Sequence, residues 1–102
     1  MSNVGKSQLP GEWSKPRAPL PKEQDILDKV KEEFEHRRNS PISKFLALLV
    51  RTQTVDGTKY LFLVDIGESE NICLFVFLPL YQEPNLEQIL KATKIDEDPL
   101  DL

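Results

Sequence analysis

The sequence predicts one α+β domain, in which a single helix packs on one face of an antiparallel β meander. Two observations lead to this prediction: an amphipathic helical stretch over residues 22–38, and three β-rich runs joined by short turns that contain glycine. The chain has 102 residues, a length typical of one domain. Its apolar residues are concentrated between Phe45 and Tyr81, so the middle of the chain can bury a core.

The helix is predicted over residues 22–38 because apolar side chains recur there at spacings of three and four. This apolar stripe consists of Ile26, Leu27, Val30 and Phe34. Acidic residues occupy the first turn and basic residues the last, which suits the dipole of a helix at both ends. The helix is expected to end at Asn39-Ser40-Pro41.

Three runs have the composition and the alternation of β-strands. They span Lys44–Gln53, Thr58–Ile66 and Ile72–Tyr81. The first two are joined by Thr54-Val55-Asp56-Gly57, and Asp-Gly between β-rich runs is a strong signal for a tight hairpin. Alternation places one set of apolar side chains of each later strand on a common face. These sets are Tyr60, Phe62, Val64 and Ile66, and then Ile72, Leu74, Val76 and Leu78.

Both ends of the chain are polar and contain proline. Residues 1–20 are predicted to form a flexible N-terminal arm, and residues 21–102 the domain proper. Trp13, the one tryptophan of the chain, lies in this arm, where it is either incidental or an anchor for a partner. After the third strand, Leu86–Lys91 is predicted as a helical turn and Lys94–Leu100 as an edge strand.

The charge and the apolar runs exclude several classes of partner. A net charge of −4 argues against nucleic acid, since binding a phosphate backbone requires a concentrated basic surface. The longest apolar runs are much shorter than the roughly 20 residues that cross a bilayer, so no membrane partner is expected. The first ten residues hold no apolar run of a signal peptide, and one cysteine allows no internal disulfide. The predicted compartment is the cytoplasm.

The sequence offers no constellation for catalysis, so we expect a protein that is not an enzyme. A cysteine nucleophile needs a histidine within hydrogen-bond reach, whereas Cys73 lies in a predicted strand and His36 near the end of the predicted helix. One cysteine and one histidine also fall short of the ligand cluster that a transition metal requires. Gly57 and Gly67 are isolated turn glycines and not a phosphate loop. No cofactor or metal is predicted.

The hairpin around Val55 is the best candidate for a functional site. Its plain interpretation is structural, because Asp56-Gly57 supplies the positive φ that a tight turn requires. A functional interpretation stands beside it, since Val55 is an apolar residue at a rigid turn, as a wedge entering the groove of a partner would be. Gln53 is able either to hold the turn or to donate a hydrogen bond to a partner's backbone.

Gln53-Thr54-Val55-Asp56-Gly57 is similar to the Gln-x-Val-x-Gly signature of the cystatins, which inhibit papain-like cysteine proteases. The chain resembles the stefins in particular, the intracellular cystatins that lack disulfides and signal peptides. The matching segments are Pro10-Gly11-Glu12-Trp13-Ser14 in the arm, Asp28-Lys29-Val30-Lys31 in the helix and Thr58-Lys59-Tyr60 after the signature. The resemblance extends from Gly11 to Phe77 without gaps, and more loosely beyond.

The resemblance implies a fold, a function and a set of site residues. The stefin fold is an antiparallel sheet of four to five strands wrapped around one long α-helix. Stefins block the cleft of papain-like cysteine proteases, such as cathepsins, with a wedge formed by the N-terminal segment and two hairpin loops. The residues of this chain that match the wedge are Gly11 in the arm, Gln53, Thr54, Val55, Asp56 and Gly57 in the first loop, and Leu80 and Tyr81 in the second.

Two positions of the wedge depart from the stefin pattern. Asp56 stands where stefins commonly carry a small apolar residue, and its charge must be desolvated or left at the rim of a complex. Leu80-Tyr81 occupies the place of a Leu-Pro pair, while Leu78-Pro79 arrives two residues earlier. These departures favour an alternative function, in which the protein keeps the fold and acts as a non-inhibitory interaction or scaffold protein.

A further departure lies on the sheet. Stefins often carry Lys, Ser, Arg or Gln at the positions occupied here by Leu46, Leu49, Leu63, Phe75 and Leu78. If Leu63 and Phe75 point away from the helix, the outer face of the sheet is unusually apolar. Such a face would serve the scaffold function, and it also predicts a homodimer or a domain swap.

Overall fold

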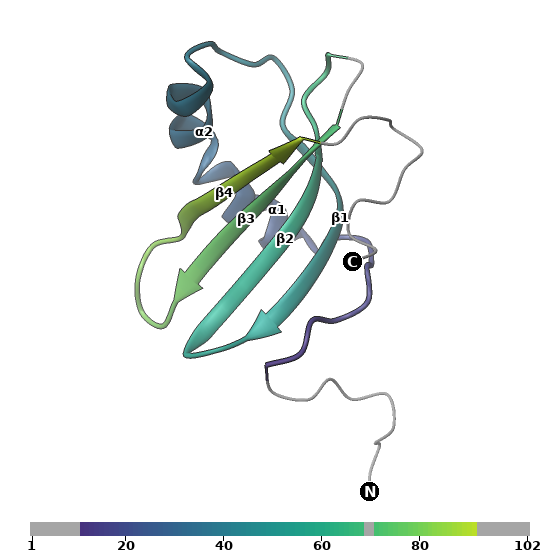
Figure 1. Cartoon of the computed structure of the whole chain (residues 1–102), viewed down its shortest axis with the longest axis vertical. Helices are drawn as coiled ribbons and strands as arrows, with labels where there is room; N and C mark the ends of the chain where they lie inside the picture. The colour runs from purple at the N-terminus through teal and green to yellow at the C-terminus, as the bar shows by residue number, and fades with distance from the viewer. Residues whose placement is uncertain (1–10, 69–70, 92–102) are drawn as a thin grey trace, which may run out of the picture.

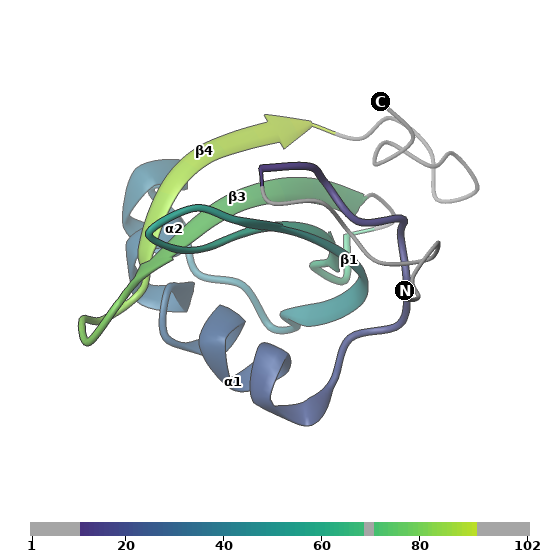
Figure 2. The same ribbon diagram turned by 90° about the horizontal axis from the view of Figure 1, so that it is seen from below.

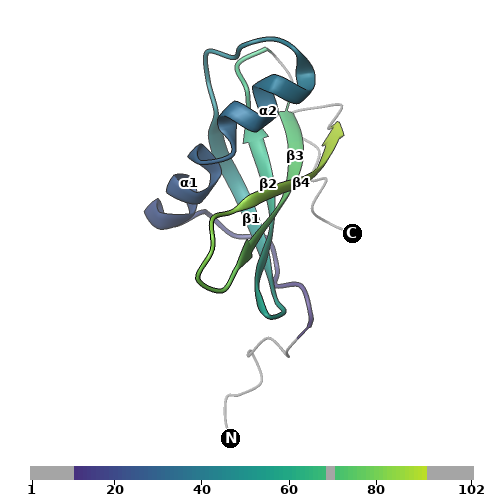
Figure 3. The same cartoon turned by 90° about the vertical axis from the view of Figure 1, so that its left-hand side faces the viewer.

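The computed structural model describes residues 11–68 and 71–91 of the chain. Within these residues, a four-stranded antiparallel sheet with the order β1-β2-β3-β4 packs against two helices (Figure 1). The elements are α1 (Pro21–Asp28), α2 (Lys31–Arg38), β1 (Leu46–Thr54), β2 (Gly57–Asp65), β3 (Asn71–Pro79) and β4 (Asn85–Lys91). Both helices lie on one side of the sheet (Figure 3). The α+β fold predicted from the sequence is confirmed.

The helical segment is divided into two helices, where the sequence predicts one continuous helix over residues 22–38. The chain tightens between them, because the N–H of Val30 donates to the carbonyl oxygen of Leu27, three residues back, at 3.0 Å. Val30 also has φ −104° and ψ 6°, outside the α region. The break sets α2 at an angle to α1 (Figure 2), and the stripe residues Leu27, Val30 and Phe34 are all buried.

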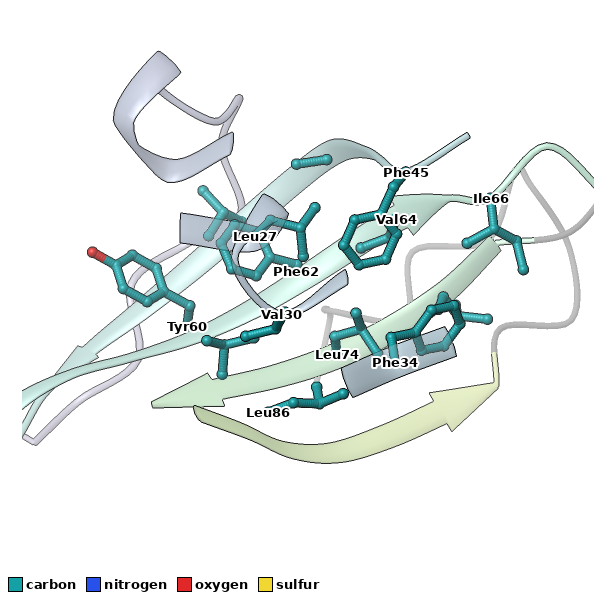
Figure 4. Packing of buried hydrophobic residues seen from close by; sticks show 14 of the residues in the cluster. Leu27, Val30, Phe34, Phe45, Tyr60, Phe62, Val64, Ile66, Leu74 and Leu86 are labelled. Atoms are coloured by element: carbon teal, nitrogen blue, oxygen red, sulfur yellow. The ribbon is translucent and has the colours of Figure 1, made fainter. Parts of the chain in front are cut away.

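The main core lies between the helices and the inner face of the sheet (Figure 4). Alternate residues of β2 and β3 point into it, as the sequence predicts. These residues are Tyr60, Phe62, Val64, Ile72, Leu74 and Val76. Ring stacking adds to the packing, since the centroids of Phe34 and Phe45 lie 5.5 Å apart.

Two β-bulges allow residues three apart in a strand to face the same core. In β1 the register with β2 shifts just after Ala47, so that Ala47 and Val50 are both buried in the main core. In β4 the extra residue is Glu87, so that Leu86 and Ile89 both pack against the same core. In a regular strand, residues three apart would point to opposite faces.

The prediction of a helical turn at Leu86–Lys91 is wrong, because these residues belong to β4. Leu86, Ile89 and Leu90 have the spacing of a helix, but a bulged strand produces the same spacing. Pairing with β3 decides between the two, since it satisfies the backbone and buries Leu86. The edge strand predicted at Lys94–Leu100 lies outside the described residues.

The outer face of the sheet carries a second apolar cluster. Its buried members, Leu61, Leu63 and Cys73, have exposed fractions of 1%, 3% and 1%. Trp13, Leu48, Leu49 and Phe75 pack against them, and the seven residues together are called the outer cluster. Leu63 and Phe75 point outward as alternation requires, but Leu63 is buried. Leu78 packs against the inner core, on the same face as Ile72, Leu74 and Val76, as alternation also predicts. The outer face is therefore less open than the sequence suggests.

The arm runs beside the outer edge of β1 before it enters α1 (Figures 1 and 2). The N–H of Ser14 donates to the carbonyl oxygen of Thr52 at 2.8 Å. Arg17 and Val50 exchange two backbone hydrogen bonds, of 3.1 and 2.9 Å, and so form a β-bridge. The sequence predicts a flexible arm over residues 1–20. Residues 14–17 of this arm extend the sheet, and residues 1–10 lie outside the described residues.

A half-buried ion pair, between exposed Arg17 and buried Glu23, ties the arm to the start of α1. The Glu23 carboxylate is 2% exposed and accepts two hydrogen bonds from the Arg17 guanidinium, at 2.8 and 2.7 Å. It also accepts the N–H of Leu20 at 2.8 Å, and so caps the first turn of the helix. The hydrogen bonds from Arg17 hold the pKa of Glu23 below its ordinary value, although burial acts in the opposite direction.

We expect Glu23→Gln to lower the free energy of unfolding by about 1–2 kcal/mol at neutral pH, because Arg17 loses a charged partner. The pKa of Glu23 is lower in the folded state than in the unfolded state. Its stabilising contribution is therefore complete above the unfolded-state pKa and is lost as the pH falls through the folded-state pKa. The difference between wild type and variant in urea unfolding should shrink toward acidic pH.

The matched control is Glu33→Gln, which removes an exposed ion pair with Arg37 on α2. This variant should cost less than about 0.5 kcal/mol at neutral pH. A Glu23→Gln effect that stays constant from neutral to strongly acidic pH would contradict the ion pair between the arm and the helix.

Candidate functional site

Three segments meet at one end of the sheet: the arm at Gly11, the β1–β2 hairpin and the β3–β4 loop. The two loops close at the same end (Figure 1), and the arm reaches that end along β1 (Figure 3). The strand register agrees, because Gly57 at the start of β2 lies opposite Pro79 at the end of β3. This end of the molecule is called the loop edge, and it comprises Gly11, residues 53–57 and residues 79–84.

Two hydrogen bonds join the arm to the first hairpin. The N–H of Gly11 donates to the carbonyl oxygen of Thr54 at 3.3 Å, and the side-chain amide of Gln53 donates to the carbonyl oxygen of Gly11 at 2.6 Å. Gly11 has φ +84°, a value that favours glycine. Gln53 thus binds the arm of its own chain, a role that the sequence did not indicate.

The turn of the first hairpin depends on Gly57. The N–H of Val55 donates to the carbonyl oxygen of Gly57 at 3.0 Å. Gly57 has φ +131°, and a Cβ at this position would lie 2.5 Å from the carbonyl oxygen of Leu78. Asp56 does not have a positive φ, so Gly57 alone supplies it. Thr54 and Asp56 are exposed at the tip, and Val55 is half-buried.

The second loop presents the two most exposed large apolar side chains of the described residues. Leu80 is 59% exposed and Tyr81 101%. Tyr81 has φ +61°, in the left-handed region that disfavours residues with a Cβ. A proline fixes φ near −65° and would not fit at this position of the turn. The Leu-Pro pair that the stefin resemblance leads us to expect at Leu80-Tyr81 would therefore not fit the backbone of this loop.

The exposed charges at the loop edge are acidic. Asp56 lies at the tip of the hairpin and Glu83 in the second loop, and Glu12 lies next to the loop edge in the arm. Water solvates an exposed carboxylate in the free protein, so Asp56 costs little until it docks against another surface. A basic group on a partner would offset this cost, whereas an apolar or acidic surface would not.

A cleft of about 350 Å³ lies beside the second loop, between the helices and the start of β4. Arg37 crosses it and donates to the Glu33 carboxylate at 2.7 Å and to the carbonyl oxygen of Leu86 at 2.6 Å. Lys29, also at the cleft, forms a 3.4 Å ion pair with Glu83. The charged groups that line the cleft are thus all paired, Lys29 with Glu83 of the second loop and Arg37 with Glu33, and we assign the cleft no ligand.

The structure separates the two residues that a cysteine-dependent enzyme would need. Cys73 is buried in the outer cluster, whereas His36 is exposed on α2, on the opposite side of the sheet. Within residues 11–68 and 71–91, no group of three His, Cys, Asp or Glu side chains could hold a metal ion. No helix in this part of the chain is long and apolar enough to cross a membrane.

The loop edge brings together every residue that the sequence singles out for the wedge. These residues are Gly11, Gln53, Thr54, Val55, Asp56, Gly57, Leu80 and Tyr81. The sequence did not reveal that Trp13 packs inside its own chain, with its ring centroid 6.0 Å from that of Phe75. The available signal was its position, as a large apolar side chain in an otherwise polar part of the arm.

The sequence model of the cystatin domain matches residues 15–98. The chain belongs to the cystatin family. It is 37% identical over 93 residues to leukocyte cysteine proteinase inhibitor 1 of Sus scrofa, covering 87% of this chain and 90% of that protein. It is 32% identical over 90 residues to human cystatin-A, covering 88% and 91%. Cystatin-B of Macaca fuscata fuscata is 35% identical over 60 residues, covering 59% and 61%.

These relatives confirm the resemblance to stefin-type cystatins. One of them is named a cysteine proteinase inhibitor, and membership of the cystatin family shows that this chain is not an enzyme. The roles of individual loop-edge residues do not follow from family membership.

We expect Gly57→Ala to destabilise this cystatin by about 3 kcal/mol, because the added methyl group collides with backbone and the φ value disfavours alanine. The colliding atoms are the carbonyl oxygen of Leu78 at 2.5 Å and Cα of Pro79 at 2.9 Å. Urea unfolding measures the loss. Gly11→Ala is the matched control: φ is also positive, but no atom lies within 4 Å of the added Cβ, so the loss should stay near about 1 kcal/mol. Equal stability of Gly57→Ala and wild type would disprove the close packing of hairpin and second loop.

Proposed function

We propose that this cystatin is a reversible inhibitor of papain-like cysteine proteases, and that its loop edge enters the active-site cleft and blocks it. The observation that carries the proposal is the assembly of Gly11, the hairpin at residues 53–57 and Leu80-Tyr81 at one end of the sheet. The relatives support the class of target, because one of them is named a cysteine proteinase inhibitor.

Each segment of the loop edge has its own role in this proposal. Val55 supplies an apolar contact at the centre, on a turn that Gly57 holds in shape. Gly11 allows the arm to bend into one side of the cleft, and Leu80 and Tyr81 extend the contact on the other. Side chains on short, hydrogen-bonded turns lose little conformational entropy on docking, so more of the contact energy appears as affinity.

The proposed targets are cathepsins, and the proposed compartment is the cytoplasm. The cysteine content supports this setting, because a secreted domain of this size typically relies on several disulfides and this chain has one cysteine. An inhibitor in this compartment would meet lysosomal cathepsins that have escaped from their organelle.

A non-inhibitory interaction role is the second candidate, and Asp56 and Tyr81 favour it. A charge at the tip of the wedge must be desolvated, and the backbone at Tyr81 gives the second loop a shape that a Leu-Pro pair cannot adopt. An outer-face docking surface has less support, because Leu61 and Leu63 are buried. The homodimer or domain swap predicted from the sequence would use the same outer face, and it stays a prediction. Light scattering at high protein concentration tests it.

We expect the wild type to inhibit papain and a cathepsin stoichiometrically, and Val55→Asp to raise the inhibition constant by about 100-fold or more. The physical reason is that the new carboxylate would have to leave water inside an apolar contact. Titration of active protease with each protein measures the effect.

Leu46→Asp is the matched control, because Leu46 is an exposed apolar residue at the far end of β1. It should leave the inhibition constant within about twofold of wild type, as expected for a site outside the interface. No inhibition by the wild type at micromolar concentration would end the inhibitor proposal and leave the second candidate.

We expect Tyr81→Gly to separate stability from inhibition. Glycine relieves the left-handed strain at φ +61° but adds freedom to the unfolded chain, so the free energy of unfolding should change by less than about 1 kcal/mol. The loss of a fully exposed aromatic side chain from the interface should raise the inhibition constant by about tenfold or more. Thermal unfolding and protease titration give the two values. Unchanged inhibition would remove Tyr81 from the wedge.

A further inference from the structure

Trp13 docks inside its own chain and does not stand free in the arm. Its ring packs edge-on against Phe75 of β3, with centroids 6.0 Å apart and an angle of 68° between the planes. Both rings belong to the outer cluster, where Leu61 of β2 lies opposite Phe75 in the strand register. The face of the sheet opposite the helices therefore provides a packing site for one side chain of the arm, that of Trp13.

Hydrogen bonds fix the backbone on both sides of Trp13. Before it, the N–H of Gly11 donates to β1 at 3.3 Å. After it, the N–H of Ser14 donates to the carbonyl oxygen of Thr52 at 2.8 Å, and the Ser14 hydroxyl accepts the N–H of Thr52 at 3.0 Å. The Arg51 guanidinium donates to the carbonyl oxygen of Ser14 at 2.8 Å. Trp13 thus extends from a segment that is already aligned with β1.

The hydrogen bonds at the arm tip are weak by themselves. The bond from Gly11 to Thr54 is long, and both residues are exposed. Water competes for donors and acceptors in such positions, so the net gain per bond is small against the entropy lost when the segment is ordered. The partial burial of the Trp13 indole against the outer cluster adds a stabilising contribution that water does not replace.

We propose that Trp13 is a positioning residue that holds Gly11 against the first hairpin before a protease arrives. This inference rests on the proposed function. The indole acts by ordering the arm in advance, so that less conformational entropy is lost on docking. Its loss releases the arm and leaves Val55 and Tyr81 in place.

The first test follows docking directly, because Trp13 is the one tryptophan of the chain and its fluorescence reports on the arm. We expect acrylamide to quench Trp13 much less in the folded protein than in urea, and Phe75→Ala to raise the quenching constant by about twofold or more. Leu90→Ala is the matched control, since Leu90 lies opposite Cys73 on the same face but outside the cluster, and quenching should not change. Folded-state quenching equal to that of the unfolded chain overturns the inference.

The second test separates positioning from direct contact through inhibition of papain. Trp13→Ala should raise the inhibition constant by about tenfold, and Trp13→Phe, which keeps an aromatic ring, should restore most of the loss. In a protein that already carries Gln53→Ala, Trp13→Ala should raise the inhibition constant by less than about threefold, because either change alone releases the arm. In a protein that carries Tyr81→Gly, Trp13→Ala should still raise the inhibition constant by about tenfold, since the arm does not hold the second loop in place. Equal penalties in the wild-type and Gln53→Ala backgrounds overturn the positioning role.

The two tests distinguish failure of this inference from failure of the proposed function. If the wild type inhibits papain and Trp13 is docked, but Trp13→Ala leaves the inhibition constant unchanged, then only the inference about Trp13 is overturned. A wild type that inhibits no papain-like protease overturns the proposed function, and the role of Trp13 in protease binding falls with it.

Discussion

Backbone pairing along both edges of β1 determines where the loop edge forms. One edge pairs with β2 through the first hairpin, and the other takes the arm through Ser14 and Arg17. Because both partners follow the same strand toward the same end, the arm tip and the hairpin arrive together, and Gln53 joins them. The register of β2 with β3 then adds the second loop, with Gly57 opposite Pro79. The candidate site is thus a consequence of strand register.

Local pattern predicted most of the fold, and long-range contacts decided the rest. Alternation in β2 and β3 placed the core residues correctly, because regular strands obey a period of two. The same rule failed at Leu86–Lys91, where a bulge mimics helical spacing. The site positions followed from resemblance to a signature, but the hydrogen bond from Gln53 to Gly11 joins residues 42 apart, and no local pattern indicates such a contact. The left-handed backbone at Tyr81 likewise depends on how the strands close.

Two residues of the loop edge do not stabilise the fold. Tyr81 combines full exposure with an unfavourable φ, and Asp56 places a charge at the tip of a hairpin. Such features are expected where a partner binds, since neither contributes to the fold itself. The outer-face leucines show the opposite case: Leu61 and Leu63 are buried and contribute to the fold. Full exposure and backbone strain at Tyr81 therefore distinguish the second loop from the buried leucines of the outer face.

Amide hydrogen exchange in the free protein tests most directly whether the arm is paired with β1 before any partner binds. The N–H groups of Ser14 and Arg17 donate to β1 at 2.8 and 3.1 Å, and the N–H of Val50 donates back to Arg17 at 2.9 Å. All three amides should exchange at least about tenfold more slowly than in the unfolded chain. Exchange of Ser14, Arg17 and Val50 at unfolded-chain rates would contradict a preassembled loop edge.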